Sequence, residues 1–480
     1  MVKYTHDAFS LLDGGWRVLN GQVPHVNFYT GLGPIIYLQS ALGLLLANGR
    51  AEGLGYIQGI TGLVLASWTL LLCKRRLNFI LSGLMSIFVA LLTVAPLNTG
   101  DWPSDISAAM IYNRYGYALL CLVLIESFTT GYAPQQHNRW GGISTGAAGA
   151  LMLFSKVSYF VVFAFLLAFS IFLKKQTKTR WTFLLGSFGA VSLMIMMYLQ
   201  FHASAMWHDI ALVAKAKHVS FGEVFDRIIV NTPLDGARSV LIAIIAAVAV
   251  WPYVKESGRS ILIATLAVNL ASVFLLSTNF QVFSFPLDTV LILLIIDRVN
   301  MICRKLPHPP IFGAALLLGG VFCMLTSTLP DITALTLSVS HRLSHNVAAK
   351  HFETPPLANF YSLDTEYVDF VNDGFRLLKQ YRRPSESIMS LDFTNPFSYG
   401  LQARPAQGGT TWLQYNVDFD YWHKPSGEEL LGSADLVMFP IRNGESTLRE
   451  TVPRLYGTYL GQHFTVVGES AEWRLFRRNR

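Results

Sequence analysis

The sequence predicts an α-helical membrane bundle of about ten spans with a soluble α/β domain at its C-terminus. Of the 480 residues, 52% are hydrophobic and only 14% are charged, whereas soluble domains have about 25% charged residues. The deficit falls in residues 1–330, where short polar segments separate long apolar runs and the net charge is +9. Residues 331–480 carry 17 acidic and 15 basic side chains, the composition of a soluble domain.

Ten segments of the first part are candidate spans. A helix needs roughly 20 apolar residues to cross a hydrocarbon core of about 30 Å. The candidates are 31–47, 55–73, 77–97, 114–133, 142–173, 181–201, 238–254, 260–277, 283–298 and 311–329. Segment 142–173 is long enough for one tilted span or for two half-helices broken near Lys156, and we count it once.

Basic loops indicate which side of the membrane each end faces, because Lys and Arg concentrate on the cytoplasmic side. Loops 174–180, 255–259 and 298–305 are the most basic and fall on one side in this count. The count predicts a bacterial inner-membrane protein whose N-terminal segment and C-terminal domain are periplasmic. It also places the basic loop 74–76 outside, which conflicts with the charge rule. Dividing 142–173 into two spans would remove this conflict, but it would move the N-terminus inside.

The C-terminal domain has the alternating pattern of a small α/β unit. Residues 365–381 have helical spacing, 387–393 and 434–441 resemble buried strands, 447–464 is amphipathic, and 465–477 resembles a closing hairpin. No glycine-rich phosphate loop follows either strand, so we expect no nucleotide site. The pattern favours an accessory or substrate-guiding domain.

The overall charge of +7 belongs to the membrane loops. It fits anionic membrane lipids or a phosphate-bearing substrate. No compact basic stripe is interleaved with aromatic residues, so we expect no nucleic-acid partner.

The most informative segment is residues 6–37. Its apolar residues Phe9, Leu12, Trp16 and Leu19 recur at helical spacing, which predicts a helix lying along the membrane surface. Gly21 would end this helix, and the turn at 31–34 would begin the next span. Asp7, at the start of the helix, would face the lipid–water boundary, where a lipid-linked substrate presents its head group.

This segment resembles the first external loop of the GT-C type of glycosyltransferases, in particular relatives of the protein mannosyltransferases and aminoarabinose transferases. In that family an acidic residue, usually Asp-Glu, precedes Leu-x-Gly by about fourteen positions, and Pro-Tyr-x-Asp-Phe and Gly-Pro follow. Asp7 lies fourteen residues before Gly21 here. The matching motifs are Leu19-Asn20-Gly21, Pro24-His25-Val26-Asn27-Phe28 and Gly33-Pro34.

The resemblance implies an enzyme that transfers a sugar from a polyprenyl-phosphate donor to a glycan, lipid or protein acceptor on the external face. It implies that Asp7 is the base that deprotonates the acceptor, with Asp105 or Asp101 as an auxiliary acid. A divalent cation is a possible cofactor. The remaining candidate substrate contacts are Lys156 and Arg114, which would bind phosphate, and His25 and Asn27 of the loop motif.

The chain departs from the family pattern in three places. Ala8 replaces the second acidic residue, and Asn27 replaces the usual Asp before Phe28. No full hydrophobic helix precedes Asp7, so we expect that a first transmembrane helix is missing from this N-terminus. These departures favour one rival function, a non-catalytic membrane subunit. A second rival is a transporter or flippase of lipid-linked saccharide, which would need no base.

Each acidic candidate also has a structural interpretation. Asp7 could cap the surface helix, and Asp13 would lie on its solvated face. Asp101 and Asp105 could belong to a polar turn. The span count places this turn, in the loop 98–113, inside, whereas the resemblance places it outside.

The other polar candidates have structural interpretations too. Lys156 could reach the membrane surface along its own side chain, and Arg114 could anchor to lipid head groups. His208 and Asp209, in the polar stretch 202–235, give a weak metal signal. A solvated face of an amphipathic helix also explains them.

Overall fold

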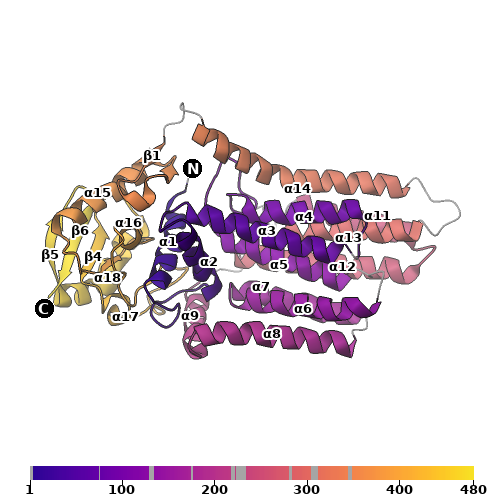
Figure 1. Cartoon of the computed structure of the whole chain (residues 1–480), viewed down its shortest axis with the longest axis horizontal. Coiled ribbons are helices and arrows are strands. Elements are labelled where there is room, and N and C mark those ends of the chain that lie inside the picture. The colour runs from indigo at the N-terminus through magenta and orange to yellow at the C-terminus, as the bar shows by residue number, and fades with distance from the viewer. Residues whose placement is uncertain are drawn as a thin grey trace.

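A computed structural model describes residues 4–74, 76–128, 134–173, 177–217, 222, 234–279, 284–303, 312–343 and 349–479. The molecule is elongated, with a bundle of helices on one side and a mixed α/β domain on the other (Figure 1). The N-terminal helices α1 (His6–Leu19) and α2 (Pro34–Leu46) lie between these two parts. We call the end of the bundle that adjoins the C-terminal domain the domain end, and the opposite one the far end.

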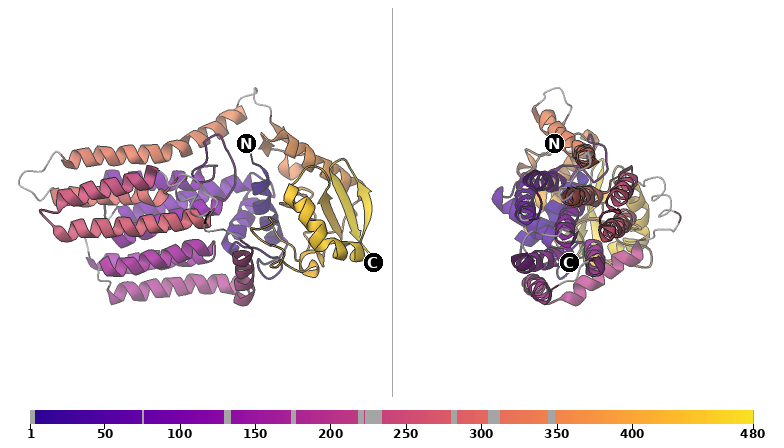
Figure 2. Two further views of the ribbon diagram at one scale, coloured as in Figure 1. Left: turned by 180° about the vertical axis from the view of Figure 1, so that it is seen from behind. Right: turned by 90° about the vertical axis from the view of Figure 1, so that its right-hand side faces the viewer.

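The bundle consists of helices that run side by side along the long axis (Figure 2). Helix α9 differs, because it turns across the domain end (Figure 1). The helices are α3 (Gly53–Cys73), α4 (Phe79–Val94), α5 (Ile111–Phe128), α6 (Pro134–Leu153), α7 (Val157–Leu173), α8 (Lys178–Tyr198), α9 (Ala203–Ala216), α11 (Leu234–Val250), α12 (Lys255–Thr278), α13 (Pro286–Cys303) and α14 (Phe312–Leu343).

Apolar surface identifies this bundle as a membrane domain. Within the described residues, four helices are long and apolar enough to cross a bilayer, namely Gly53–Cys73, Lys178–Tyr198, Lys255–Thr278 and Leu318–His341. Shorter apolar helices are Pro34–Leu46, Phe79–Val94, Val157–Ile171 and Ala237–Val250. Large apolar side chains such as Leu63, Leu71 and Leu318 are exposed, as side chains facing lipid would be. The membrane character is confirmed, but the full set of about ten spans is not.

We expected the N-terminal helix to lie along a lipid surface, but the structure places its apolar face against protein. Phe9 and Leu12 are fully buried and share a hydrophobic core with Phe352 and Phe375 of the C-terminal domain. The apolar face of α1 is therefore covered by protein. An amphipathic pattern indicates that one face is buried, but it does not specify what covers that face.

The segment 31–47 forms a helix of 13 residues, which is only about 20 Å long and too short to span a membrane unaided. Its C-terminal end contacts the C-terminal domain, because Tyr399 Oη donates a hydrogen bond to the Gly49 carbonyl at 2.9 Å. Gly49 has a φ of +78°, a conformation that glycine adopts without steric cost. We therefore expect α2 to lie at the domain end without crossing.

The segment 142–173 forms two helices, so our count of it as one span was wrong. α6 ends at Leu153 and α7 begins at Val157. Two backbone hydrogen bonds attach the break to the start of α2, from Gly33 N–H to the Ser155 carbonyl and from Ile35 N–H to the Phe154 carbonyl. A Cβ on Gly33 would lie 2.0 Å from the Phe154 carbonyl oxygen, so only glycine permits this contact.

The loop that contains Asp101 and Asp105 lies at the domain end. Tyr4 N–H donates to the Ile106 carbonyl at 3.4 Å, and Tyr4 forms a parallel bridge with Ser107. The N-terminal segment and this loop therefore lie on the same side, whereas our span count had placed them on opposite sides, so the count was wrong about their relative position.

The basic loop at 74–76 joins the other basic segments at the far end. Arg76 at the end of α3 forms a 2.8 Å ion pair with Glu126 near the end of α5. Arg180, at the start of α8, donates to the Glu126 carbonyl at 3.2 Å. Arg298 of α13 donates to Ser257 at the start of α12. The loop 74–76 therefore no longer conflicts with the other basic segments. This follows because segment 31–47 need not cross the membrane and segment 142–173 forms two helices.

The C-terminal domain is built around a four-stranded sheet in the order β3-β4-β6-β5. β3 (Ile388–Ser390) is parallel to β4 (Leu436–Pro440), and β6 (Trp473–Arg478) is antiparallel to both β4 and β5 (Phe464–Glu469). The other elements are β1 (Lys350–His351), η1 (Pro355–Leu357), β2 (Tyr361–Ser362), α15 (Thr365–Tyr381), α16 (Pro396–Gly400), α17 (Gly427–Leu431) and α18 (Ser446–His463).

This arrangement contains the two strands, two helices and closing hairpin predicted from the sequence. Helix α14 continues through Asp331, where we expected the membrane domain to end, as far as Leu343.

The arrangement of the ends can be tested by labelling single cysteines with a membrane-impermeant thiol reagent. The four native cysteines are buried, whereas Trp102, Trp422 and Tyr253 are exposed. Trp102→Cys and Trp422→Cys should label from the same side of the membrane, because both lie at the domain end. Tyr253→Cys, between α11 and α12, should label from the other side. Labelling of positions 102 and 422 from opposite sides would contradict the fold.

Candidate functional site

Asp7 and Lys156, two residues selected separately from the sequence, line one cavity at the domain end. The cavity has a volume of about 130 Å³, which is room for several water molecules. Its walls come from α1, the turn at 31–32, the start of α5, the α6–α7 break, the ends of α9 and α12, and the C-terminal domain. We call it the Asp7 cavity.

Asp7 lies in the first turn of α1 and is not the N-cap residue, which is Thr5. The carboxylate is partly exposed, and His6 Nε2 lies 3.4 Å from its Oδ2 atom. Burial raises the pKa of Asp7 above its ordinary value, and the charge of His6 opposes this shift. A carboxylate with a raised pKa is a stronger base. The position and environment of Asp7 thus suit proton abstraction better than helix capping.

Lys156 lies in the break between α6 and α7, with its ammonium group in the cavity. Nζ donates to the carboxamide oxygens of Asn113 and Asn279, at 2.9 and 2.5 Å, and lies 4.8 Å from the centre of the Tyr112 ring. These partners are neutral carboxamides, so they orient the Lys156 amine without pairing it with a carboxylate. The alternative in which Lys156 reaches the membrane surface does not describe this geometry.

The cavity also contains aromatic and charged residues that were not predicted as site residues. Tyr112 and Trp412 stack with their ring centres 6.4 Å apart. Lys217, at the end of α9, donates to the Thr278 carbonyl, and Asp418 comes from the C-terminal domain. Lys217 belongs to the polar stretch that we assigned to a solvated face. We find no pattern in the sequence that would have selected Trp412 or Asp418.

Arg114 does not join Asp7 and Lys156. Its guanidinium group is buried and donates to the carbonyls of Leu92 and Leu97, both at 2.6 Å, and to Asp331. Because these donors are committed to internal acceptors, we no longer assign Arg114 to a substrate phosphate. Its role as an anchor to lipid head groups fails for the same reason.

Asp101 lines a separate cavity of about 210 Å³, together with Arg114 and Asp331. Burial raises the pKa of Asp101 to about 6, and the negative charges of Asp105 and Asp7 contribute to this shift. Asp101 is therefore close enough to Asp7 to interact with it electrostatically. Asp105 is half-buried and does not line the Asp7 cavity.

His25 and Asn27 line a third cavity of about 650 Å³. His25 Nδ1 lies 2.8 Å from Asp209 Oδ2, and the backbone of His25 has a φ of +66°. Asn27 Oδ1 accepts from the Val23 N–H at 2.8 Å, which closes the turn between them. Asp209 is buried against the N-terminal loop, so its assignment to a solvated face was wrong.

Asp13 is fully buried, so its assignment to a solvated face of α1 was also wrong. Its Oδ2 accepts from Arg17 Nε at 2.7 Å, and Arg17 is fully buried as well. Nη1 of Arg17 continues to the carbonyls of Ala406 and Gly408, at 2.8 and 2.9 Å. The pair therefore joins α1 to the C-terminal domain.

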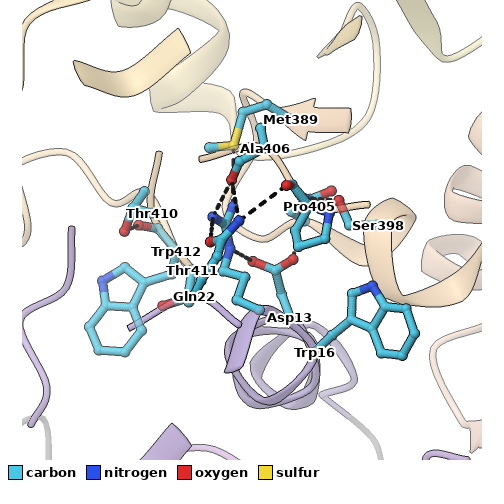
Figure 3. Close-up of polar contacts among 12 residues, drawn as sticks. Asp13, Trp16, Gln22, Met389, Ser398, Pro405, Ala406, Thr410, Thr411 and Trp412 are labelled. Atoms are coloured by element: carbon cyan, nitrogen blue, oxygen red, sulfur yellow. Dashed lines mark hydrogen bonds and ion pairs between the residues drawn. The ribbon is translucent and has the colours of Figure 1, made fainter. Parts of the chain in front are cut away.

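Further hydrogen bonds extend this junction. Gln22 donates to the carbonyls of Pro405 and Ala406, both at 3.1 Å, and Figure 3 shows Gln22 and Asp13 beside these residues. Tyr29 N–H donates to the Gly409 carbonyl, and Tyr29 Oη donates to the Asp418 carbonyl at 2.8 Å. The segment 403–418, which carries Trp412 and Asp418 of the Asp7 cavity, is thus held by the N-terminal loop.

No protein-family model matches the chain, and no curated protein matches it in sequence.

The buried pair can be tested by substitution. Asp13→Asn should lower the free energy of unfolding by about 3–5 kcal/mol, because it leaves the Arg17 charge buried without its partner. The double variant Asp13→Leu, Arg17→Met removes both charges and should be less destabilised than Asp13→Asn. Thermal unfolding of the protein in lipid nanodiscs measures the difference. A fully stable Asp13→Asn protein would show that the pair is not structural.

Proposed function

We propose that the protein is a membrane glycosyltransferase that moves a sugar from a polyprenyl-phosphate donor to an acceptor at the domain end. The observation that carries this proposal is the meeting of Asp7 and Lys156 in one cavity. A base and a phosphate-binding cation are the two groups that this reaction needs. The two residues are separated by nearly 150 positions in the sequence, and they were selected for different reasons.

The chemistry follows from these two groups. The acceptor oxygen forms a bond to the anomeric carbon while the bond from that carbon to the phosphate oxygen breaks. The proton of the acceptor hydroxyl passes to the Asp7 carboxylate, whose raised pKa suits a base. The bonding electron pair leaves with the lipid phosphate. Lys156 and Lys217 stabilise the charge that develops there.

The size of the cavity fits the polar part of a lipid-linked donor. About 130 Å³, at about 10–15 Å³ for each water molecule, can hold the sugar and the phosphate of the donor together, but not a long isoprenoid chain. The lipid tail would therefore extend along the apolar helices of the bundle. We place the domain end on the periplasmic side of a bacterial inner membrane, because the described basic segments gather at the far end.

Across the parts of the chain that the structure describes, no group of three or more His, Cys, Asp or Glu side chains could hold a metal ion. In this proposal the two lysines carry the charge of the phosphate.

The rival functions make different demands on the cavity. A flippase of lipid-linked saccharide would use the lysines for the phosphate but would need no base with a raised pKa. A non-catalytic subunit would need neither group. The environment of Asp7 favours the transferase, and substitution of Asp7 separates the three functions.

Asp7→Asn should leave folding nearly unchanged, because Asp7 is partly exposed and is not the N-cap residue of α1. Transfer should fall by about 10²-fold or more, the usual contribution of a positioned general base. Asp369→Asn, an exposed carboxylate of the C-terminal domain, is the matched control and should retain full activity. The assay measures the glycan phenotype that deletion of the gene reveals, in membranes at equal expression. Wild-type activity of Asp7→Asn would reject Asp7 as the base.

The pH dependence provides a second check. Transfer should decline as the pH falls through the pKa of Asp7, because protonation removes the base, and this limb should lie above the ordinary carboxyl range. The charge of His6 lowers the pKa of Asp7, so His6→Ala should move the acid limb to higher pH. A limb that His6→Ala leaves in place would mean that a different group controls the rate.

A further inference from the structure

Asp418 is a buried carboxylate whose side-chain oxygens have no hydrogen-bond partner within the described ranges of the chain. It is 2% exposed, and neither Oδ1 nor Oδ2 has a partner among the described residues. Its backbone, in contrast, is held on both sides. The N–H donates to the Gln414 carbonyl at 2.9 Å, and the carbonyl accepts from Tyr29 Oη at 2.8 Å. The fold thus positions this carboxylate while leaving its acceptors unused.

A neighbouring carboxylate shows that this state is unusual within the same loop. Asp420 is equally buried, but its Oδ1 accepts from the backbone N–H groups of Trp422 and His423, and its Oδ2 lies 3.1 Å from His423 Nδ1. A buried acceptor without a hydrogen-bond partner costs free energy of folding, so its presence needs an explanation. A bound ligand that donates hydrogen bonds to Asp418 provides one.

The surroundings of Asp418 restrict the chemistry of that ligand. Asp418 lines the Asp7 cavity together with Lys156 and Lys217. Two lysines in one small cavity disfavour a metal cation and favour a ligand with a phosphate. The carboxylates of Asp7 and Asp418 would accept hydrogen bonds from hydroxyl groups of the ligand. The stacked rings of Tyr112 and Trp412 give the cavity an apolar wall. A phosphorylated sugar combines phosphate, hydroxyl groups and an apolar C–H face.

We propose that Asp418 and Trp412 of the C-terminal domain form the sugar-binding subsite of this cavity. The Asp418 carboxylate accepts hydrogen bonds from two hydroxyl groups of the donor sugar, and the Trp412 ring packs against the C–H face of that sugar. Lys156 and Lys217 bind the phosphate. The inference rests on the proposed function and extends it, because the C-terminal domain then selects the sugar. Asp418 contacts substrate without taking part in proton transfer.

The test uses the full chain in lipid nanodiscs and two kinds of probe. One probe is farnesyl phosphate, and the others are farnesyl phosphates linked to glucose, mannose or galactose. For the wild type we expect at least one glycosylated probe to bind more tightly than farnesyl phosphate. Asp418→Asn should abolish this gain, a loss of about tenfold or more, and should bind farnesyl phosphate as the wild type does. Lys156→Ala should weaken binding of all the probes.

Thermal unfolding without ligand separates the proposed binding role of Asp418 from a structural role. Without ligand, Asp418→Asn should unfold at the same temperature as the wild type or higher, because it removes an unpaired buried carboxylate. The matched control Asp420→Asn should unfold at a lower temperature and keep the gain from the sugar. Retention of the gain by Asp418→Asn, or no gain for any of the three sugars, would overturn the subsite alone. Failure of the wild type to bind any probe, farnesyl phosphate included, would overturn the proposed function as well.

Discussion

The organisation of the site depends on the buried ion pair between Asp13 and Arg17. Both side chains are fully buried, and such a pair is stable only when its remaining hydrogen-bonding groups are satisfied. The carbonyls of Ala406 and Gly408 accept hydrogen bonds from Arg17 Nη1. The donors of Arg17 are therefore satisfied only when the C-terminal domain is in contact with α1. Gly408 makes this contact possible, because its φ of +75° and its closeness to the Glu429 carbonyl leave no room for a side chain.

The same contact assembles the Asp7 cavity. Asp7 lies six residues, or about 1.7 turns, before Asp13 on α1, while Trp412 and Asp418 follow Gly408 on the opposing segment. The membrane bundle contributes Lys156 at the break between α6 and α7, and hydrogen bonds from Gly33 and Ile35 attach that break to the start of α2. The proposed base, the proposed phosphate-binding lysine and the proposed sugar contacts thus come from three parts of the chain that meet at one end of the bundle. The C-terminal domain therefore forms one wall of the Asp7 cavity.

The sequence predicted local features better than their surroundings. Helix α15 and the strands of the C-terminal sheet were predictable, because helical and strand periodicity is a property of a short segment. Asp7 was found from motif spacing, and Lys156 from a charge within an apolar run. The burial of Asp13 was not predictable, because an Asp four residues before an Arg also describes an exposed helical pair. The segments 31–47 and 142–173 are apolar throughout, and only the fold shows that one is a short helix and the other two helices.

We propose that the domain end assembles a site for a lipid-linked phosphate. A structure of the full chain in a lipid nanodisc with bound farnesyl phosphate would show directly whether it does. We expect the phosphate density in the Asp7 cavity, within hydrogen-bonding distance of the Lys156 ammonium group and with the Asp7 carboxylate facing the same space. The isoprenoid density should continue along the outside of the bundle helices. Phosphate density bound elsewhere, with the Asp7 cavity filled only by solvent, would contradict the account.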